Sequence, residues 1–231
     1  MSGPALRPQS ARFTPATGTP TDAFVIHLKT DPIHLLKTTA MAMALALALA
    51  VSAVSFSAHA EEATDNQPPP KVKIETTKGT IVIEVFTAEA PLSAANFLKL
   101  VDEGFYDGLI FHRVVANFVV QTGGYNAKLT YRTPPGTVEN ESGNGLKNAR
   151  GTVAMARQTD PDSADAQFFI NMRDNPHLDP VGDRAGYSVF GKVIAGMDAA
   201  ERIELADTNI QAGMAGVPEH PIEIIAVTRL P

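Results

Sequence analysis

Short segments with strand-like alternation, separated by turn residues, make up most of the C-terminal part of the sequence. Residues 72–76 and 80–86 alternate apolar and polar side chains around Lys78-Gly79, which predicts a β-hairpin. Similar short segments follow at 109–115, 118–121, 152–157, 167–172, 187–193 and 222–230. Helical spacing is confined to residues 91–103 and 196–206. This pattern predicts a mainly β fold with two helices, either a closed antiparallel barrel or a sandwich.

Composition narrows the class of protein further. The chain has 231 residues, 44% of them apolar, which is enough to bury the core of one domain with extensions. It has no Cys, so disulfides, thiol catalysis and Cys-ligated metal sites are excluded. Residues 61–231 hold 15 basic and 23 acidic side chains. An acidic surface repels phosphate backbones, so we expect no binding to nucleic acid.

Residues 1–60 have the features of an N-terminal extension that ends in a signal peptide. No charged residue lies between Thr38 and Ala58, and Lys37 precedes this stretch. Ala58-His59-Ala60 places small residues where a signal peptidase reads them, so we predict cleavage between Ala60 and Glu61. A membrane anchor is the alternative, because the uncharged run approaches the roughly 20 residues that span a bilayer. Ser and His residues dilute that run, so we expect no stable membrane association after cleavage.

The mature chain is expected to begin with a linker. Residues 61–70 (EEATDNQPPP) are polar and end in three prolines, which predicts a short extended spacer. A single folded domain is expected over residues 71–231.

The sequence lacks the motifs that are typical of hydrolases and of metal-binding sites. There is no Gly-x-Ser-x-Gly motif, and His112, His177 and His220 lie in unrelated contexts. No pair of His has the i, i+4 spacing of a metal site, and no acidic cluster has calcium-loop spacing. We therefore expect no metal and no cofactor, and the lack of a nucleophile–base pair argues against a hydrolase.

Three polar side chains interrupt otherwise apolar strands. Arg113 lies within residues 111–115, Gln121 ends residues 118–121, and Gln167 shares a strand face with Phe169. Singly, each has an ordinary structural explanation, such as an Arg that reaches solvent along an apolar stem. Together, one guanidinium, two amides and several Phe rings could line an apolar groove with a few polar contacts. His112 alternates away from Arg113, and we interpret it as a hydrogen-bonded structural residue.

Four segments, in order and at similar spacing, resemble the cyclophilin family of peptidyl-prolyl cis–trans isomerases. They are residues 111–121 (FHRVVANFVVQ), 151–157 (GTVAMAR), 167–170 (QFFI) and 187–193 (YSVFGKV). The resemblance spans residues 71–231. Residues 179–186 and the predicted signal peptide are similar to the periplasmic bacterial branch, which implies a periplasmic location. The family fold implied is a closed eight-stranded antiparallel β-barrel capped by two α-helices.

The resemblance also implies roles for particular residues. Arg113 and Gln121 would be the catalytic residues, with Gln121 as a polar partner. The substrate-binding residues implied are Phe118, Val119, Ala156, Arg157, Gln167, Phe169, His177, Leu178 and Tyr187. Val119, Arg157, His177 and Tyr187 stand where many family members have Met, Asn, Trp and His respectively. Because that Trp binds cyclosporin in many eukaryotic members, we predict weakened cyclosporin binding with turnover retained.

These residue types suit bond rotation. Turning an Xaa–Pro bond requires no proton transfer, because its barrier of ~18–20 kcal/mol is lost amide resonance. A guanidinium that binds the twisted amide best lowers that barrier, and an apolar slot favours the less polar twisted state. We expect proline-containing polypeptide substrates and a monomeric enzyme that acts during folding of exported proteins. The alternative is a proline-peptide binding module or holdase chaperone on the same scaffold, although a pure binder needs no buried guanidinium.

Overall fold

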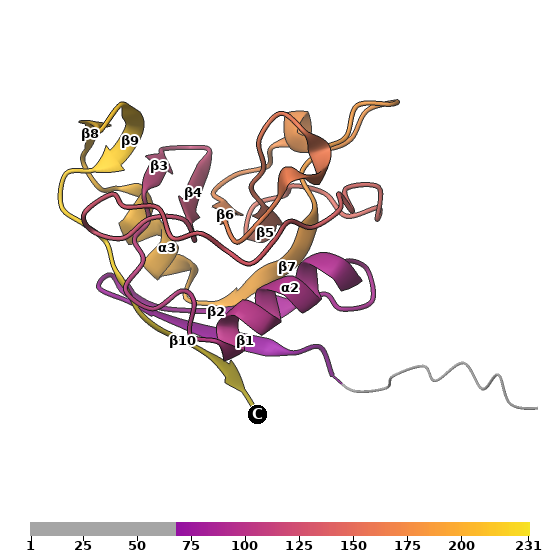
Figure 1. The fold of residues 1–231 in the computed structure, drawn as a ribbon, viewed down its shortest axis with the longest axis horizontal. Helices are drawn as coiled ribbons and strands as arrows, with labels where there is room; N and C mark the ends of the chain where they lie inside the picture. The colour runs from indigo at the N-terminus through magenta and orange to yellow at the C-terminus, as the bar shows by residue number, and fades with distance from the viewer. Residues whose placement is uncertain (1–67) are drawn as a thin grey trace, which may run out of the picture. The chain divides into compact units, whose positions relative to one another are not determined.

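Eight antiparallel strands form one curled sheet in the computed structural model, which describes residues 68–231 (Figure 1). The order of strands in the sheet is β10-β1-β2-β7-β5-β6-β4-β3, and β8 and β9 form a separate hairpin. The strands are β1 Lys71–Thr76, β2 Gly79–Val85, β3 Arg113–Val115, β4 Val119–Thr122, β5 Thr152–Met155, β6 Phe168–Asn171, β7 Val189–Ala195, β8 Thr208–Gln211, β9 Met214–Pro218 and β10 Ile224–Leu230. The α-helices are α2 Pro91–Asp102 and α3 Met197–Glu204, and Pro161–Ser163 and Pro176–Leu178 form single 3-10 turns. The predicted mainly β fold with two helices is confirmed.

The predicted closure of the barrel is wrong. The edge strands β3 and β10 share no ladder, and one isolated bridge, Ile110 to Glu223, joins the segments that precede them. Main-chain hydrogen bonds from Phe111 N–H to Ile222 O and from Ile224 N–H to Leu109 O accompany that bridge. The physical reason is that β9 packs against β3, so β10 meets only the residues ahead of β3. The sheet is therefore an open, curled half-barrel.

Alternating side chains and one face of α2 build the core. Alternate residues of β1 and β2 are buried, as the hairpin pattern predicts. Helix α2 begins with a proline in its first turn and ends before Gly104, which adopts φ +65°. Its Phe97 ring lies within 5.1–5.5 Å of the rings of Tyr106, Phe168 and Phe190. This aromatic cluster joins the helix to β6 and β7 of the sheet.

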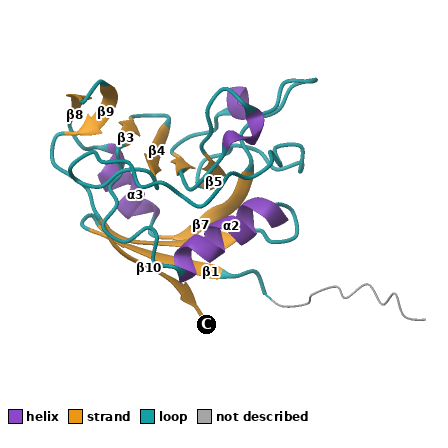
Figure 2. Cartoon of the chain, in the orientation of Figure 1, coloured by secondary structure: helices purple, strands orange, loops and turns teal. Residues whose placement is uncertain are grey.

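Long loops cover the remaining surface (Figure 2). Between β4 and β5 the chain forms only isolated bridges. No helix among residues 68–231 is long and apolar enough to cross a membrane. The predictions for residues 1–60 and for residues 61–67 of the linker lie outside the described residues.

Candidate active site

A cavity of about 320 Å³ opens where β3, β4, β5 and β6 meet the loops that follow them. Nine of the residues predicted from the resemblance line it: Arg113, Phe118, Val119, Gln121, Ala156, Arg157, Phe169, Leu178 and Tyr187. Gln167 lines a neighbouring cavity instead, and the ring of His177 stacks on that of Phe118 with centroids 5.4 Å apart. The structure therefore brings the predicted set together.

Strand register places the polar groups in one row. Arg113 on β3 is paired with Gln121 on β4, and Gln121 is paired with Phe169 on β6. The Arg113 Nη1 group donates to Gln121 Oε1 at 3.3 Å, and Gln121 Nε2 donates to Gln167 Oε1 at 3.1 Å. This chain of hydrogen bonds orients the guanidinium, whose Cζ lies 5.7 Å from the centroid of the Phe118 ring.

Among the residues that the structure describes, Arg113 has no carboxylate partner for its charge. None of the ion pairs within residues 68–231 includes this guanidinium. Its remaining N–H groups make no side-chain or main-chain hydrogen bond there. A half-buried guanidinium in this state can donate to an oxygen or nitrogen atom of a ligand.

An apolar slot lies beside Arg113. Val119, Ala156, Phe169 and Leu178 are buried and form a small cluster distinct from the main core. The Tyr187 ring meets the Phe169 ring edge-on at a centroid distance of 5.6 Å. Aromatic and aliphatic walls of this kind exclude water and suit a small apolar ring.

Hydrogen bonds to main-chain oxygens of neighbouring loops hold the Arg157 side chain in place. Its guanidinium donates to the main-chain oxygens of Gly186, Ala185, Gln158 and Thr159 at 3.1, 3.0, 2.9 and 3.4 Å. Its Cζ atom lies 4.7 Å from the centroid of the Tyr187 ring, within the range of a cation–π contact. Most of its donors are thus occupied, although the side chain forms part of the cavity wall.

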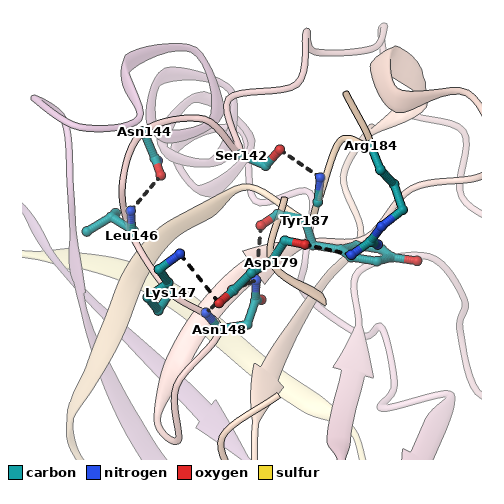
Figure 3. Close-up of polar contacts among 9 residues, drawn as sticks. Ser142, Asn144, Leu146, Lys147, Asn148, Asp179, Arg184 and Tyr187 are labelled. Atoms are coloured by element: carbon teal, nitrogen blue, oxygen red, sulfur yellow. Dashed lines mark hydrogen bonds and ion pairs between the residues drawn. The ribbon is translucent and has the colours of Figure 1, made fainter. Parts of the chain in front are cut away.

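The loop at 179–186, which leads into Tyr187, is anchored by residues that sequence reasoning missed (Figure 3). The buried Asp179 accepts hydrogen bonds at Oδ1 from the main chain and side chain of Asn148, at 2.8 and 3.1 Å. Arg184 Nη2 donates to the Asp179 carbonyl at 2.9 Å, and the Gly186 N–H donates to Ser142 Oγ at 2.9 Å. No local motif marks these residues, because their partners lie more than thirty positions away or in an irregular loop.

His112 is buried behind the row of polar groups. Burial lowers its pKa to about 4, and the positive charge of Arg113 acts in the same direction. Its Nδ1 atom is buried without a hydrogen-bond partner, so the predicted hydrogen-bonded role is wrong at that atom. Its ring packs at 4.8 Å against that of Tyr125. Within residues 68–231 no group of three or more His, Asp or Glu side chains is arranged to hold a metal ion.

The curled sheet carries an apolar slot with an arginine at its edge, an arrangement that suits a protein that binds proline-containing peptides. The sequence profile described as "Cyclophilin type peptidyl-prolyl cis-trans isomerase/CLD" matches residues 71–229. The chain therefore belongs to the cyclophilin family, and it is a peptidyl-prolyl cis–trans isomerase.

Bacterial relatives agree with this assignment. The chain is 44% identical to a peptidyl-prolyl cis-trans isomerase of Acinetobacter baylyi, over 74% of this chain and 88% of the relative. It is 42% identical to peptidyl-prolyl cis-trans isomerase B of Escherichia coli, over 68% of this chain and 98% of the relative.

Solved structures show the same fold. A cyclophilin-type isomerase of Cryptosporidium parvum aligns with a TM-score of 0.57 and 26% identity, over 71% of this chain and 98% of that one. A second structure of that protein, in the presence of the dipeptide Ala-Pro, aligns with a TM-score of 0.56 and 27% identity, over 70% and 99% of the two chains.

Proposed function

We propose that this isomerase turns Xaa–Pro bonds in polypeptides during their folding after export, and that Arg113 stabilises the twisted amide. The observation that carries the proposal is the guanidinium at the edge of the apolar slot, which no carboxylate of residues 68–231 neutralises. The presence of Ala-Pro in the structure of the Cryptosporidium protein supports proline-containing peptides as the substrate class.

In this proposal the substrate proline occupies the slot formed by Phe118, Val119, Phe169 and Leu178. As the C–N bond twists, the amide loses resonance and becomes less polar, which an apolar environment favours. The guanidinium then donates to the prolyl nitrogen or to the neighbouring carbonyl. Because that hydrogen bond strengthens as the amide twists, it lowers the barrier rather than only tightening binding.

The magnitudes are consistent with one charged donor acting together with desolvation. Unaided exchange takes tens to hundreds of seconds, so a turnover of ~10 s⁻¹ requires a factor of about a thousand, or roughly 4 kcal/mol. A hydrogen bond to a charged group contributes ~1.5–3 kcal/mol. Arginine stays protonated at physiological pH, so we expect turnover to be nearly flat with pH.

A proline-peptide isomerisation assay on the wild type, Arg113→Ala and Arg113→Lys tests the proposed role. We expect kcat/KM to fall about 100-fold in Arg113→Ala, with only partial recovery in Arg113→Lys, since a single ammonium lacks the planar fork of donors. Arg173→Ala removes an exposed arginine outside the cavity lining and serves as the control. A value for Arg113→Ala within threefold of the wild type would contradict the proposed role. An inactive wild type that still suppresses aggregation would support the holdase alternative.

We also propose that the mature enzyme is a periplasmic monomer released from its signal peptide. The support is the uncharged stretch from Thr38 to Ala58 followed by Ala58-His59-Ala60. N-terminal sequencing of protein from the periplasmic fraction should begin at Glu61, and sedimentation should give the mass of one chain. A start upstream of Glu61, retention in the membrane fraction, or a dimer would contradict the respective part.

A further inference from the structure

We infer that a second cavity beside Arg113 binds an uncharged, largely apolar side chain of the substrate, from a residue close to the proline. This inference rests on the proposed function and extends it to substrate selection. The cavity measures about 360 Å³. Its lining residues are His112, Arg113, Gln121, Tyr125, Gln167, Met214 and Ala215.

The two cavities share part of their walls. Arg113 and Gln121 line both of them, so the guanidinium stands between the proline slot and the second cavity. A peptide whose proline ring occupies the slot can therefore continue past Arg113 into the second cavity. An extended chain advances roughly 3.3 Å per residue, so the side chain that enters belongs to a residue about one to three positions from the proline.

The β8–β9 hairpin supplies the apolar wall of the second cavity. Its turn contains Ala212 and Gly213, both with positive φ, and Met214 and Ala215 follow at the start of β9. Gly216 adopts φ +78°, and a Cβ atom there would lie 2.9 Å from the main-chain oxygen of Val114. This close approach lays β9 directly on β3 and fixes Met214 beside Arg113. A flexible, polarizable Met side chain can adapt to occupants of different shape.

The charges around the second cavity select against cations. Arg113 is the one formally charged side chain in its lining, which includes no carboxylate. Burial lowers the pKa of His112 to about 4, so that ring is neutral at physiological pH. A Lys or Arg side chain would meet the positive charge of Arg113, with no carboxylate in the cavity wall to pair with it. A carboxylate would compete with the prolyl amide for the donors of Arg113. The Tyr125 ring and Met214 instead offer apolar contact, which favours Leu, Met or Phe side chains.

Matched peptides around one Ala-Pro core test the inference. Leu, Lys or Glu is placed in turn at each of the three positions before and after the core, and kcat/KM is measured for each peptide. At one position, the wild type should turn over the Leu peptide at least fivefold faster than the Lys peptide. Met214→Glu should reverse this preference by adding a negative charge to the cavity wall. Ile210→Glu, on the same hairpin but exposed and outside the cavity, should keep the wild-type ratio.

The outcomes distinguish failure of the second binding site from failure of the proposed isomerase function. A Leu-to-Lys ratio near one at every position, or a ratio unchanged in Met214→Glu, would overturn the second binding site while leaving isomerase activity intact. A wild type that fails to turn over any Ala-Pro peptide would instead contradict the proposed function. Met214→Ala provides a second variant, and it should reduce the Leu preference through loss of apolar contact. An equal preference in Met214→Ala and wild type would also count against the site.

Discussion

The guanidinium of Arg157 forms part of the wall of the binding site, but most of its hydrogen-bond donors are already occupied and are not free to bind a ligand. Four carbonyl oxygens accept its hydrogen bonds, and its Cζ atom lies 4.7 Å from the centroid of the Tyr187 ring. The Tyr187 ring in turn packs against Phe169 in the apolar slot. Arg157 therefore acts as a positioning residue for the slot wall.

We expect Arg157→Ala to raise KM about five- to tenfold with kcat changed less than about twofold, because the slot wall supports ground state and transition state alike. Arg157→Lys should not restore KM, since an ammonium cannot bridge four carbonyl groups. Steady-state kinetics on a proline peptide measure both constants. A fall in kcat with KM unchanged would show that Arg157 acts on the twisted amide directly.

Burial of His112 makes the stability of the protein depend on pH. Its pKa falls from 6.5 to about 4 in the folded state, so the unfolded chain takes up a proton first as pH decreases. The stabilisation is complete above pH 6.5 and is lost progressively down to pH 4. At pH 5 the loss from this residue is about 2 kcal/mol relative to pH 7.5.

Urea unfolding of the wild type and His112→Gln at pH 7.5 and pH 5 measures this contribution. The wild type should lose about 2 kcal/mol more than the variant between the two pH values. His177 and His220 are exposed, so His177→Gln is a suitable control. Equal losses in the wild type and His112→Gln would assign the pH dependence to other groups.

The loop at 179–186 is held in place by one buried carboxylate, that of Asp179. Asp179 accepts two hydrogen bonds from Asn148 and lies 3.8 Å from Lys147 Nζ. Lys147 is largely exposed, so its ion pair contributes little. Removal of the carboxylate, by contrast, leaves the buried Asn148 main-chain N–H without a partner.

Asp179→Ala should therefore lower the free energy of unfolding by about 2–3 kcal/mol, whereas Lys147→Ala should lower it by less than about 0.5 kcal/mol. Asp179→Asn keeps an oxygen acceptor and should fall between them. Urea titrations followed by circular dichroism give the three values. Equal effects of Asp179→Ala and Lys147→Ala would mean that the ion pair, and not the hydrogen bonds, holds the loop.

The elements that could be predicted from the sequence are those whose determinants lie within the element itself. The β1–β2 hairpin and both helices were predicted because their side-chain periods and turn residues lie within the elements themselves. The β8–β9 hairpin was missed because β8 is mostly exposed on both faces and shows no alternation. Its position depends on the close approach of Gly216 to Val114, which no local pattern encodes.

The two arginines of the site differ in the same way, because the surroundings of Arg113 could be predicted from the sequence and those of Arg157 could not. Arg113 lies beside Gln121 because their strands pair within a segment of nearby residues. The resemblance to the family had already indicated that both residues belong to the site. The surroundings of Arg157 depend on the carbonyls of Ala185 and Gly186, whose orientation is set by the anchored loop. Such long-range contacts could not be predicted from the sequence.

For the whole molecule, one prediction concerns the independence of the folded domain. The buried apolar residues among 68–231 extend from Val72 to Val227, and β1 lies between β10 and β2 in the sheet. A chain that begins at Glu61 should therefore match the full chain in Tm and in kcat/KM. A chain that begins at Thr77 lacks the internal strand that joins β10 to β2 and should not fold. Thermal melts followed by circular dichroism compare the three chains, and a lower Tm for the Glu61 start would show that earlier residues stabilise the domain.

The open edge of the sheet has a consequence for the size of substrate that the enzyme can accept. Arg113 lies on edge strand β3, which shares a ladder with β4 alone, whereas the proline slot is built on β4 and β6 inside the sheet. A displacement of β3 breaks only its ladder with β4 and carries along the β8–β9 hairpin that packs on it, so the arginine side of the groove can adjust while the apolar slot keeps its strand pairing. We therefore expect the enzyme to accept prolines in partly folded, bulky loops in addition to those in fully extended segments.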